Sequence, residues 1–416
     1  MNHKPLSRRN FVTLLSGASM AANVSFYSNN LELPVKKTLP AKDLFSIKGT
    51  YINAAYTHPM SKGSYHQIQK FLNERMGNRL ELKTFDGFER ASVTASFAKL
   101  INASSEEIAW IPSTMFGENF VVHALDIPKS KAHVVTDALH FHGSLHLYNT
   151  LSKGGCKLTC IKPRENKIEL EEIRQAIRPD TKLISVSLVS ATTGFSHDLK
   201  KLCEIAHAQG VMVYADIIQA AGAVPIDVKE TNVDFCACAT YKWLMGDFGI
   251  GFLYIRKDRL PLMQRSFIGY RQMSGFVSHI LPYESPGDQA FESESAETMS
   301  GHFEIGTFAN EGINALRYSI PLLNEIGVEK IYQYRKPMID RLQNELPKAK
   351  YIPLTPSDSV SPIVCFAFKD AAKILKPKLD AADISISVYE HMIRISPSIY
   401  NDMNDIEKLI SVLRKG

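Results

Sequence analysis

Two side chains near the middle of the chain have types and positions suited to reaction with an aromatic ring that carries an aldehyde. Asp216 follows the apolar run 212–215, and Lys242 follows the apolar run 235–239. If both runs are strands of an open α/β sheet, both side chains lie at strand carboxyl ends, where such sheets bind ligands. A partly desolvated lysine has a lowered pKa and can attack an aldehyde, and a buried carboxylate can keep a pyridine nitrogen protonated.

This pair of side chains suits pyridoxal 5'-phosphate (PLP), a ring that accepts electrons from a carbanion at a substrate's α-carbon. The lysine would hold the cofactor as a Schiff base. An aspartate at a strand end and a surface lysine are each common, however. Spacing alone therefore supports two interpretations equally, a PLP site and two unrelated side chains.

The elements that would position these residues alternate along the chain. Strands are predicted at residues 108–111, 133–136, 157–161, 183–188, 212–215, 235–239 and 251–255, with helical patterns between most of them. Helical spacing also occurs at 63–76 and 89–101. The alternation predicts an α/β domain with a mainly parallel, seven-stranded sheet. Residues 258–306 follow neither pattern and are predicted to be an irregular loop region at the active site or an interface.

Composition and length predict an ordinary globular protein of two domains. The chain has 416 residues, 45% hydrophobic and 22% charged, with a net charge of +5. We predict a signal-like segment at 1–30, a lead-in at 31–64, a large PLP-binding domain at 65–309 and a small α+β domain at 310–416. No Lys/Arg block is long enough to suggest a nucleic-acid groove. The six cysteines contain no C-x-x-C pair and read as small buried residues, and no metal site is predicted.

The first residues have the order of an export signal. Arg8, Arg9 and Phe11 stand in the run S-R-R-N-F-V, which precedes a short apolar stretch at 13–24 and a polar stretch at 25–30. The apolar stretch is too short for a comfortable membrane span. The order resembles a bacterial twin-arginine signal. That machinery exports folded proteins, so the resemblance implies an exported or periplasmic protein that is loaded with its cofactor beforehand. The alternative is a basic tail.

The middle of the chain also carries an ordered series of motifs. From Asp216 it reads D-x-x-Q-x-x-G-x-x-P-x-D, then D-F, then K-W, then G-x-G-F-L-Y. This series resembles the class V aminotransferase family of fold-type I PLP enzymes. The family includes cysteine desulfurases, selenocysteine lyases, kynureninases and isopenicillin-N-epimerase-like proteins. The resemblance extends from residue 51 to the C-terminus and implies the fold-type I architecture.

The resemblance assigns roles to residues near the predicted lysine. Lys242 is implied as the Schiff-base lysine and Asp216 as the partner of the pyridine nitrogen. Gln219 is implied to hydrogen-bond the cofactor's phenolic oxygen. Tyr241 stands where the family has a phosphate-contacting His or Tyr. Thr240 could replace the phosphate-binding Ser that desulfurases have one position earlier.

Further motifs imply the rest of the cofactor site. Ser113 and Thr114 stand in a strand–loop–helix element similar to the family's E-I-x-F-x-x-G/S-T-T, and a helix N-terminus suits a phosphate. In the run L-H-F-H-G, His140 is favoured to stack over the pyridine ring, with His142 as the alternative. Thr307, in E-I-G-T, resembles the threonine that reaches the phosphate of a neighbouring subunit. It implies a homodimer with shared active sites.

Substrate contacts are implied at both ends of the chain. Arg394 stands in a run similar to the family's I-R-x-S-x-x-x-Y-N and would clamp the α-carboxylate of an amino-acid substrate, a task suited to a planar bidentate donor. Residues 53–58 match the first strand of the family. Tyr56 or His58 would line the substrate pocket, and Asn53 is a further predicted substrate-binding residue.

Departures from the family pattern narrow the predicted activity. Desulfurases carry a loop cysteine before the carboxylate-binding arginine, and residues 384–394 contain none. Ala191 and Ala239 replace a cofactor-contacting Asn and a phosphate-binding Ser. An aminotransferase or epimerase-like enzyme is therefore favoured. A selenocysteine or cysteine lyase without a loop cysteine and a non-catalytic PLP binder stay open as alternatives. A nucleotide-dependent dehydrogenase is disfavoured, because no G-x-G-x-x-G follows an early strand.

Overall fold

The computed structural model describes residues 38–77 and 88–415. The predicted twin-arginine segment at 1–30 lies outside the described residues. Within those two ranges, no helix is both long and apolar enough to cross a membrane.

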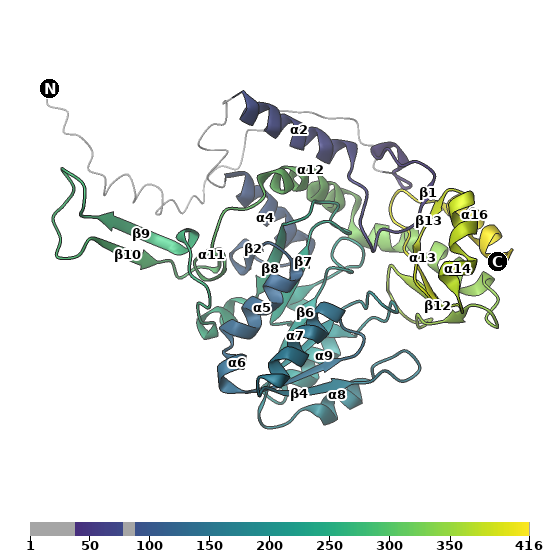
Figure 1. Ribbon diagram of the computed structural model, residues 1–416, viewed down its shortest axis with the longest axis horizontal. Helices are drawn as coiled ribbons and strands as arrows, with labels where there is room; N and C mark the ends of the chain where they lie inside the picture. The colour runs from purple at the N-terminus through teal and green to yellow at the C-terminus, as the bar shows by residue number, and fades with distance from the viewer. Residues whose placement is uncertain (1–37, 78–87, 416) are drawn as a thin grey trace.

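A seven-stranded sheet forms the centre of the large domain (Figure 1), in the order β2-β8-β7-β6-β5-β3-β4. The strands are β2 (Ile108–Ile111), β3 (His133–Asp137), β4 (Lys157–Ile161), β5 (Thr181–Ser187), β6 (Met212–Asp216), β7 (Phe235–Ala239) and β8 (Gly251–Ile255). Only β8 runs antiparallel to its neighbours. The predicted mainly parallel α/β architecture is confirmed, because each predicted run is a strand of this sheet.

Both faces of the sheet are buried. Along β7, Phe235 and Ala237 join one apolar core, whereas Cys236 and Cys238 join another. Side chains that alternate between two cores explain why these strands are continuous apolar runs. The helices of this domain are α2 (Lys62–Met76), α4 (Phe88–Leu100), α5 (Thr114–Ala124), α6 (Ile127–Ser130), α7 (His142–Lys153), α8 (Leu170–Ala176), α9 (Leu199–His207), α10 (Val228–Thr231), α11 (Met299–Phe303) and α12 (Asn310–Ile326).

A smaller C-terminal domain contains an antiparallel sheet of order β11-β12-β15-β14. Its elements are α13 (Val328–Glu345), β11 (Ile352–Pro353), β12 (Val364–Ala367), α14 (Ala371–Ile374), α15 (Lys376–Ala381), β13 (Ile384–Ser385), β14 (Ser387–Val388), β15 (Met392–Ile395) and α16 (Met403–Arg414). The smaller α+β domain is thus confirmed. Strand β1 (Thr50–Tyr51) pairs with β13, so the lead-in is attached to this domain. The residue boundaries between the domains stay a prediction.

The region predicted to be irregular contains regular structure, so that prediction was wrong in part. Strands β9 (Met273–Ser278) and β10 (Phe291–Ser295) form an antiparallel hairpin that projects from the body of the protein (Figure 1). Every residue of β10 is exposed, and β9 has no buried residue. Without a buried face the strands lack the alternation of apolar and polar residues by which strands are recognised.

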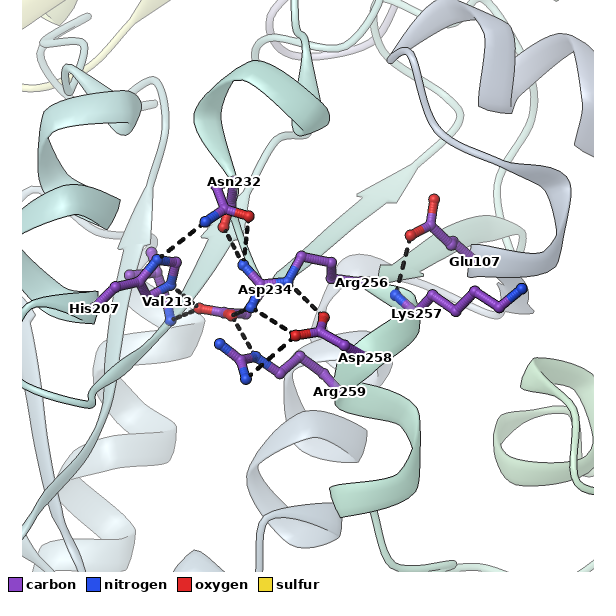
Figure 2. Close-up of polar contacts among 9 residues, drawn as sticks. All are labelled: Glu107, His207, Val213, Asn232, Asp234, Arg256, Lys257, Asp258 and Arg259. Carbon is purple, nitrogen blue, oxygen red and sulfur yellow. Dashed lines mark hydrogen bonds and ion pairs between the residues drawn. The ribbon is translucent and has the colours of Figure 1, made fainter.

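Asp234 immediately precedes β7, and its side chain is hydrogen-bonded to Val213 of β6 (Figure 2). It lies at the end of these strands opposite to Asp216. Its buried carboxylate accepts hydrogen bonds from the Val213 backbone N–H at 2.7 Å, His207 Nε2 at 2.8 Å and Arg259 Nε at 2.7 Å. Burial alone would raise the pKa of Asp234, but these bonds lower it below the ordinary 3.8. The aspartate of the D-F motif is therefore structural.

Replacing Asp234 with Asn is expected to lower the free energy of unfolding by about 3 kcal/mol, the cost of breaking a buried ion pair. A carboxylate with a depressed folded-state pKa contributes stability above its unfolded-state pKa and loses it as pH falls through the folded-state pKa. Urea unfolding between about pH 7 and pH 3 should therefore show a shallower acid dependence in Asp234→Asn than in the wild type. Equal unfolding free energies at about pH 7 would contradict this role.

Candidate active site

A cleft opens at the carboxyl ends of the parallel strands and encloses about 460 Å³, part of it open to solvent. The cleft is lined by Ser113, Thr114, Met115, Phe141, Ser187, Val189, Ala191, Asp216, Ile218, Gln219, Ala239, Tyr241 and Lys242. The structure thus brings together six predicted cofactor residues: Ser113, Thr114, Asp216, Gln219, Tyr241 and Lys242.

Lys242 follows β7 and lies in the wall of the cleft, with only 8% of the residue exposed. Burial lowers its pKa from 10.5 to about 8; Asp216 opposes the shift and Arg394 adds to it. Burial has this effect because it disfavours the charged ammonium. An amine with this pKa is partly neutral near physiological pH and can act as a nucleophile or a base.

The pKa of Lys242 makes the capture of PLP by cofactor-free protein dependent on pH. Only the neutral amine attacks an aldehyde, and Nζ loses its proton as pH rises through about 8. The rate of capture, followed by absorbance, is therefore expected to rise with pH and level off above about 8. A rate that continued to rise to the ordinary lysine pKa of 10.5 would show that the side chain is not desolvated.

Asp216 ends β6 and is 3% exposed. Its Oδ1 accepts a hydrogen bond from the Ile218 backbone N–H at 2.9 Å. Burial raises the pKa of Asp216 to about 6, while the nearby His140 opposes the shift. A desolvated carboxylate next to the cleft is suited to bind a protonated ring nitrogen.

Gln219 has a fixed amide orientation. Trp243 Nε1, which can only donate, bonds to Gln219 Oε1 at 2.9 Å, and Gln219 Nε2 donates to the Ala55 carbonyl at 3.1 Å. The amide nitrogen has a second hydrogen available to a ligand. The loop that follows packs closely here, because a Cβ at Gly222 (φ +90°) would lie 2.6 Å from the Trp243 carbonyl oxygen. This close approach explains the glycine of the motif.

Ser113 and Thr114 begin helix α5 and lie in the cleft. Ser113 Oγ caps the helix by accepting from the Phe116 N–H at 3.4 Å. Thr114 Oγ1 accepts from the Ala239 N–H at 2.9 Å, which joins the helix start to the end of β7. Backbone N–H groups at a helix N-terminus bind anions such as phosphate. The predicted phosphate element thus has suitable geometry.

Tyr241 and Thr240 differ in their placement. Tyr241 lines the cleft, and its ring stacks on Phe248 with a centroid distance of 4.7 Å. Thr240 is fully buried, and its Oγ1 donates to the Asp247 carbonyl at 2.7 Å. The structure therefore gives the Thr240 hydroxyl a role in the turn after β7 and does not place it in the cleft.

The ring that lines the cleft beside α7 belongs to Phe141 and not to His140. His140 is 1% exposed, and its ring nitrogens lie 2.8 Å from Ser187 Oγ, 3.1 Å from Ser185 Oγ and 3.2 Å from Glu118 Oε1. His142 is the first residue of α7 and is also absent from the cleft lining. Of these three consecutive residues, only Phe141 lines the cleft, and the stacking of His140 or His142 over the ring stays a prediction.

Arg394 lies on β15 and is 5% exposed. Its Nη1 donates to the carbonyl of Ala191, a cleft residue, at 2.9 Å, and its Nη2 donates to Ser387 Oγ at 3.1 Å. Ser387 Oγ in turn donates to Asn53 Oδ1 at 2.7 Å. The buried Nε has no hydrogen-bond partner among the described residues. Asn53 therefore supports the arginine through Ser387 and does not line the cleft itself.

Two other predicted residues lie outside the cleft of this chain. Tyr56 is 65% exposed and is not one of the cleft-lining residues. Thr307 is exposed, and its Oγ1 lies 2.9 Å from the Tyr270 hydroxyl. Neither side chain contributes to the cleft within one subunit.

Sequence reasoning missed Glu118, a fully buried carboxylate on α5 that bonds to His140. The available signal was a charged residue in the apolar stretch of a helix that begins at Thr114. No cysteine lines the cleft. Cys365 pairs with Arg394 across β12 and β15, but burial raises the pKa of this thiol to about 12. Across 38–77 and 88–415, no cluster of His, Cys, Asp or Glu could hold a metal ion.

Comparison with known proteins identifies the family of this chain. Residues 65–409 match the family model Aminotransferase class-V. The uncharacterized aminotransferase YcbU of Bacillus subtilis is 28% identical over 316 residues, which cover 76% of this chain and 80% of that protein. The cysteine desulfurase IscS of Neisseria meningitidis is 30% identical over 239 residues, covering 56% of this chain and 59% of that protein.

Solved structures share the fold. The cysteine desulfurase CsdA of Escherichia coli superposes with a TM-score of 0.77 at 19% identity, covering 91% of this chain and 98% of that one. The cystine C-S lyase C-DES, in complex with cysteine persulfide, gives a TM-score of 0.76 at 19% identity and covers 88% and 97%. The amine, carboxylate, amide and helix N-terminus of the cleft fit PLP chemically. The chain therefore belongs to the class-V aminotransferase family of enzymes, with PLP as its cofactor.

Proposed function

We propose that this enzyme acts at the α-carbon of an amino acid as an aminotransferase or an epimerase-like enzyme. The observation that carries the proposal is that Lys242 and Asp216 line one cleft, with Arg394 directly behind the lining residue Ala191. None of the six cysteines, all of which lie within the described residues, lines this cleft. PLP supplies an electron sink for the carbanion that forms when the α-proton leaves. The chain's own residues must bind the cofactor, orient the substrate and move the α-proton.

In this proposal four groups hold the cofactor. Ser113 and the N–H groups at the start of α5 bind its phosphate. Asp216 binds the ring nitrogen, and the Gln219 amide nitrogen donates to the ring oxygen. Phe141 takes the stacking position that the sequence favoured for His140, because its ring lines the cleft.

Arg394 and Lys242 act on the substrate. Arg394 lies against the cleft residue Ala191 and offers its guanidinium to the α-carboxylate, and this contact orients the α-carbon. Lys242 Nζ carries the cofactor and, once displaced by the substrate's amine, takes up the α-proton as a general base. A pKa of about 8 suits a group that must both accept and return a proton near neutral pH.

A second candidate is a lyase that cleaves a C–S or C–Se bond without a thiol of its own. It is supported by the sequence likeness to cysteine desulfurase IscS and the structural likeness to the cystine C-S lyase C-DES. A persulfide mechanism needs a reactive thiolate at the site. Cys365, beside Arg394, has a raised pKa and is fully buried, which disfavours that mechanism.

A product assay separates these candidates. The cofactor-loaded enzyme is incubated with each common amino acid, with cysteine, cystine and selenocysteine, and with or without a 2-oxo acid. A new amino acid formed from the 2-oxo acid indicates transamination, and loss of optical purity indicates epimerisation. Release of sulfide or selenide would overturn the proposal in favour of the lyase. Absence of α-proton exchange in heavy water with every amino acid would instead indicate a non-catalytic binder.

We further propose a homodimer in which Thr307 reaches the phosphate of the neighbouring subunit. The exposure of Thr307 and its separation from its own cleft support this arrangement. Light scattering should give twice the mass of one chain, and Thr307→Ala should weaken PLP binding more than Thr231→Ala does. A monomer that binds PLP fully would contradict the proposal.

We also propose that the enzyme is exported, folded and loaded, through the twin-arginine machinery of a bacterial host, on the basis of Arg8 and Arg9 in their sequence context. Fractionation of cells should place the wild type in the periplasm and the Arg8→Lys, Arg9→Lys double variant in the cytoplasm. Equal distribution of the two proteins would contradict export by this route.

A further inference from the structure

A buried carboxylate and a buried imidazole lie behind the cleft, where the proposed mechanism does not use them. Glu118 is 0% exposed, and its Oε1 lies 3.2 Å from His140 Nε2 and accepts from Ser185 Oγ at 2.8 Å. Ser144 Oγ donates to the other carboxylate oxygen. Every oxygen of Glu118 thus has a donor, as an ionised carboxylate in this position requires.

His140 connects this carboxylate to the cleft. Its Nε2 faces Glu118, and its Nδ1 lies 2.8 Å from the hydroxyl of Ser187, which lines the cleft. Ser187 pairs directly with Asp216 across β5 and β6. A continuous line of contacts therefore runs from Glu118 through His140 and Ser187 to the strand position beside Asp216.

Glu118 and His140 each stabilise the charged form of the other. Burial alone would lower the pKa of His140, but Glu118, Asp216 and Asp137 raise it above 6.5. Burial alone would raise the pKa of Glu118, but His140 lowers it. Protonated His140 then donates from both ring nitrogens, so the Ser187 hydroxyl hydrogen must point to another acceptor. Of the charged groups near Asp216, His140 and Lys242 lower its pKa, whereas Glu118 by itself raises it. The other titratable groups near Asp216 have raised pKa values and are neutral: Tyr214, Cys236, Cys238 and Tyr241.

We infer that Glu118 and His140 form a buried ion pair whose imidazolium keeps Asp216 ionised at the wall of the cleft. Burial favours the neutral form of Asp216, and His140 is the first-listed group that opposes this effect, ahead of the Ile218 N–H and Lys242. Glu118 and His140 are thus positioning residues that act through Asp216, and Glu118 is needed because an unpaired imidazolium would not stay charged at this depth. The inference rests on the proposed function in one respect only: in that function, the charge of Asp216 binds the ring nitrogen of the cofactor.

The test measures the charge of Asp216 in cofactor-free protein, where no substrate or turnover is involved. The carboxyl carbon of Asp216 is followed by NMR in protein labelled at aspartate and is assigned with Asp216→Asn. In His140→Asn, the pKa of Asp216 is expected to rise by about one pH unit, because the opposite charge of the imidazolium has been removed. Glu118→Gln tests the other half of the pair: His140 is expected to lose its second ring proton at about pH 7, because the carboxylate that raises its pKa is gone. If the ionised form is the one that binds, PLP binding by His140→Asn should weaken by about tenfold at about pH 5 and by about twofold at about pH 7.

Asp234→Asn is the matched control, since Asp234 is also a buried carboxylate bonded to a histidine but lies at the opposite edge of the sheet. It should leave the Asp216 titration unchanged. An unchanged Asp216 titration in a folded His140→Asn variant would overturn the inference, as would a His140 ring that stays doubly protonated in a folded Glu118→Gln variant. The imidazole nitrogen signals of His140 in the wild type give a test that needs no folded variant. A doubly protonated ring at about pH 7 is expected, and a neutral ring would overturn the inference.

The two proposals can fail separately. If the Asp216 titration shifts as expected but no amino acid is turned over, the proposed function fails and the ion pair stands. If turnover is found and the titration does not shift, the ion pair fails and the function stands.

Discussion

Replacing Lys242 with Ala is expected to lower turnover of the enzyme's amino-acid substrate by about 10⁴-fold, at the upper end of the effect of losing a general base. The change removes both the covalent attachment of the cofactor and the group that moves the α-proton. Steady-state rates at saturating substrate and cofactor measure the loss. The protein should still fold, because Lys242 faces the cleft and a smaller side chain leaves the strands intact.

The control for this variant is Lys257→Ala. Lys257 is a surface lysine whose Nζ lies 3.0 Å from Glu106, away from the cleft-lining residues. Its loss should leave turnover unchanged. Turnover by Lys242→Ala within tenfold of the wild type would contradict the assignment of the general base.

Replacing Asp216 with Asn is expected to lower turnover by about 10²- to 10³-fold, similar to the loss of one preorganised electrostatic contact. The amide keeps the shape of the side chain but cannot hold a proton on the ring nitrogen by its charge. The cofactor should remain covalently attached in this variant because Lys242 is intact. The comparison of turnover with covalent PLP content therefore separates the two residues.

Asp258→Asn serves as the control for Asp216→Asn. Asp258 pairs with Arg256 on the surface and has no contact with the cleft. Near-normal turnover by Asp216→Asn would contradict the proposed role of the carboxylate. Full loss of PLP from that variant would indicate a structural role instead.

The central sheet was predictable because most of its strands are buried on both faces, the edge strand β4 being the exception. Runs such as 235–239 are apolar throughout, and the chemical residues Asp216 and Lys242 follow such runs directly. The β9–β10 hairpin was not predictable in the same way. Its strands have no buried face, so burial in the core does not impose an alternating pattern on their sequence.

The cofactor residues were predictable where a motif fixes the position of the backbone at the cleft. They were less predictable where the direction of a side chain decides whether it faces the cleft. Ser113, Asp216, Gln219 and Lys242 reach the cleft as the motifs imply. In the run from His140 to His142, consecutive side chains point in different directions, and a sequence does not show which one faces the cleft.

Buried polar partners explain the remaining differences. Thr240 bonds to the Asp247 carbonyl and His140 to Glu118, so both side chains turn away from the cleft. A buried polar group must find a partner, and the partner is set by tertiary contacts between distant segments. Glu118 was missed for the same reason, because its partners come from β5 and α7 and the residues before α7.

Borohydride reduction of the PLP-loaded protein, followed by peptide mapping, tests the central claim most directly. Reduction makes the bond between a lysine and the cofactor permanent, so the modified residue can be identified by mass spectrometry. We expect the phosphopyridoxyl group on the peptide that contains Lys242, and no modification of Lys242→Ala. An unmodified Lys242, or the group on another lysine, would contradict the account.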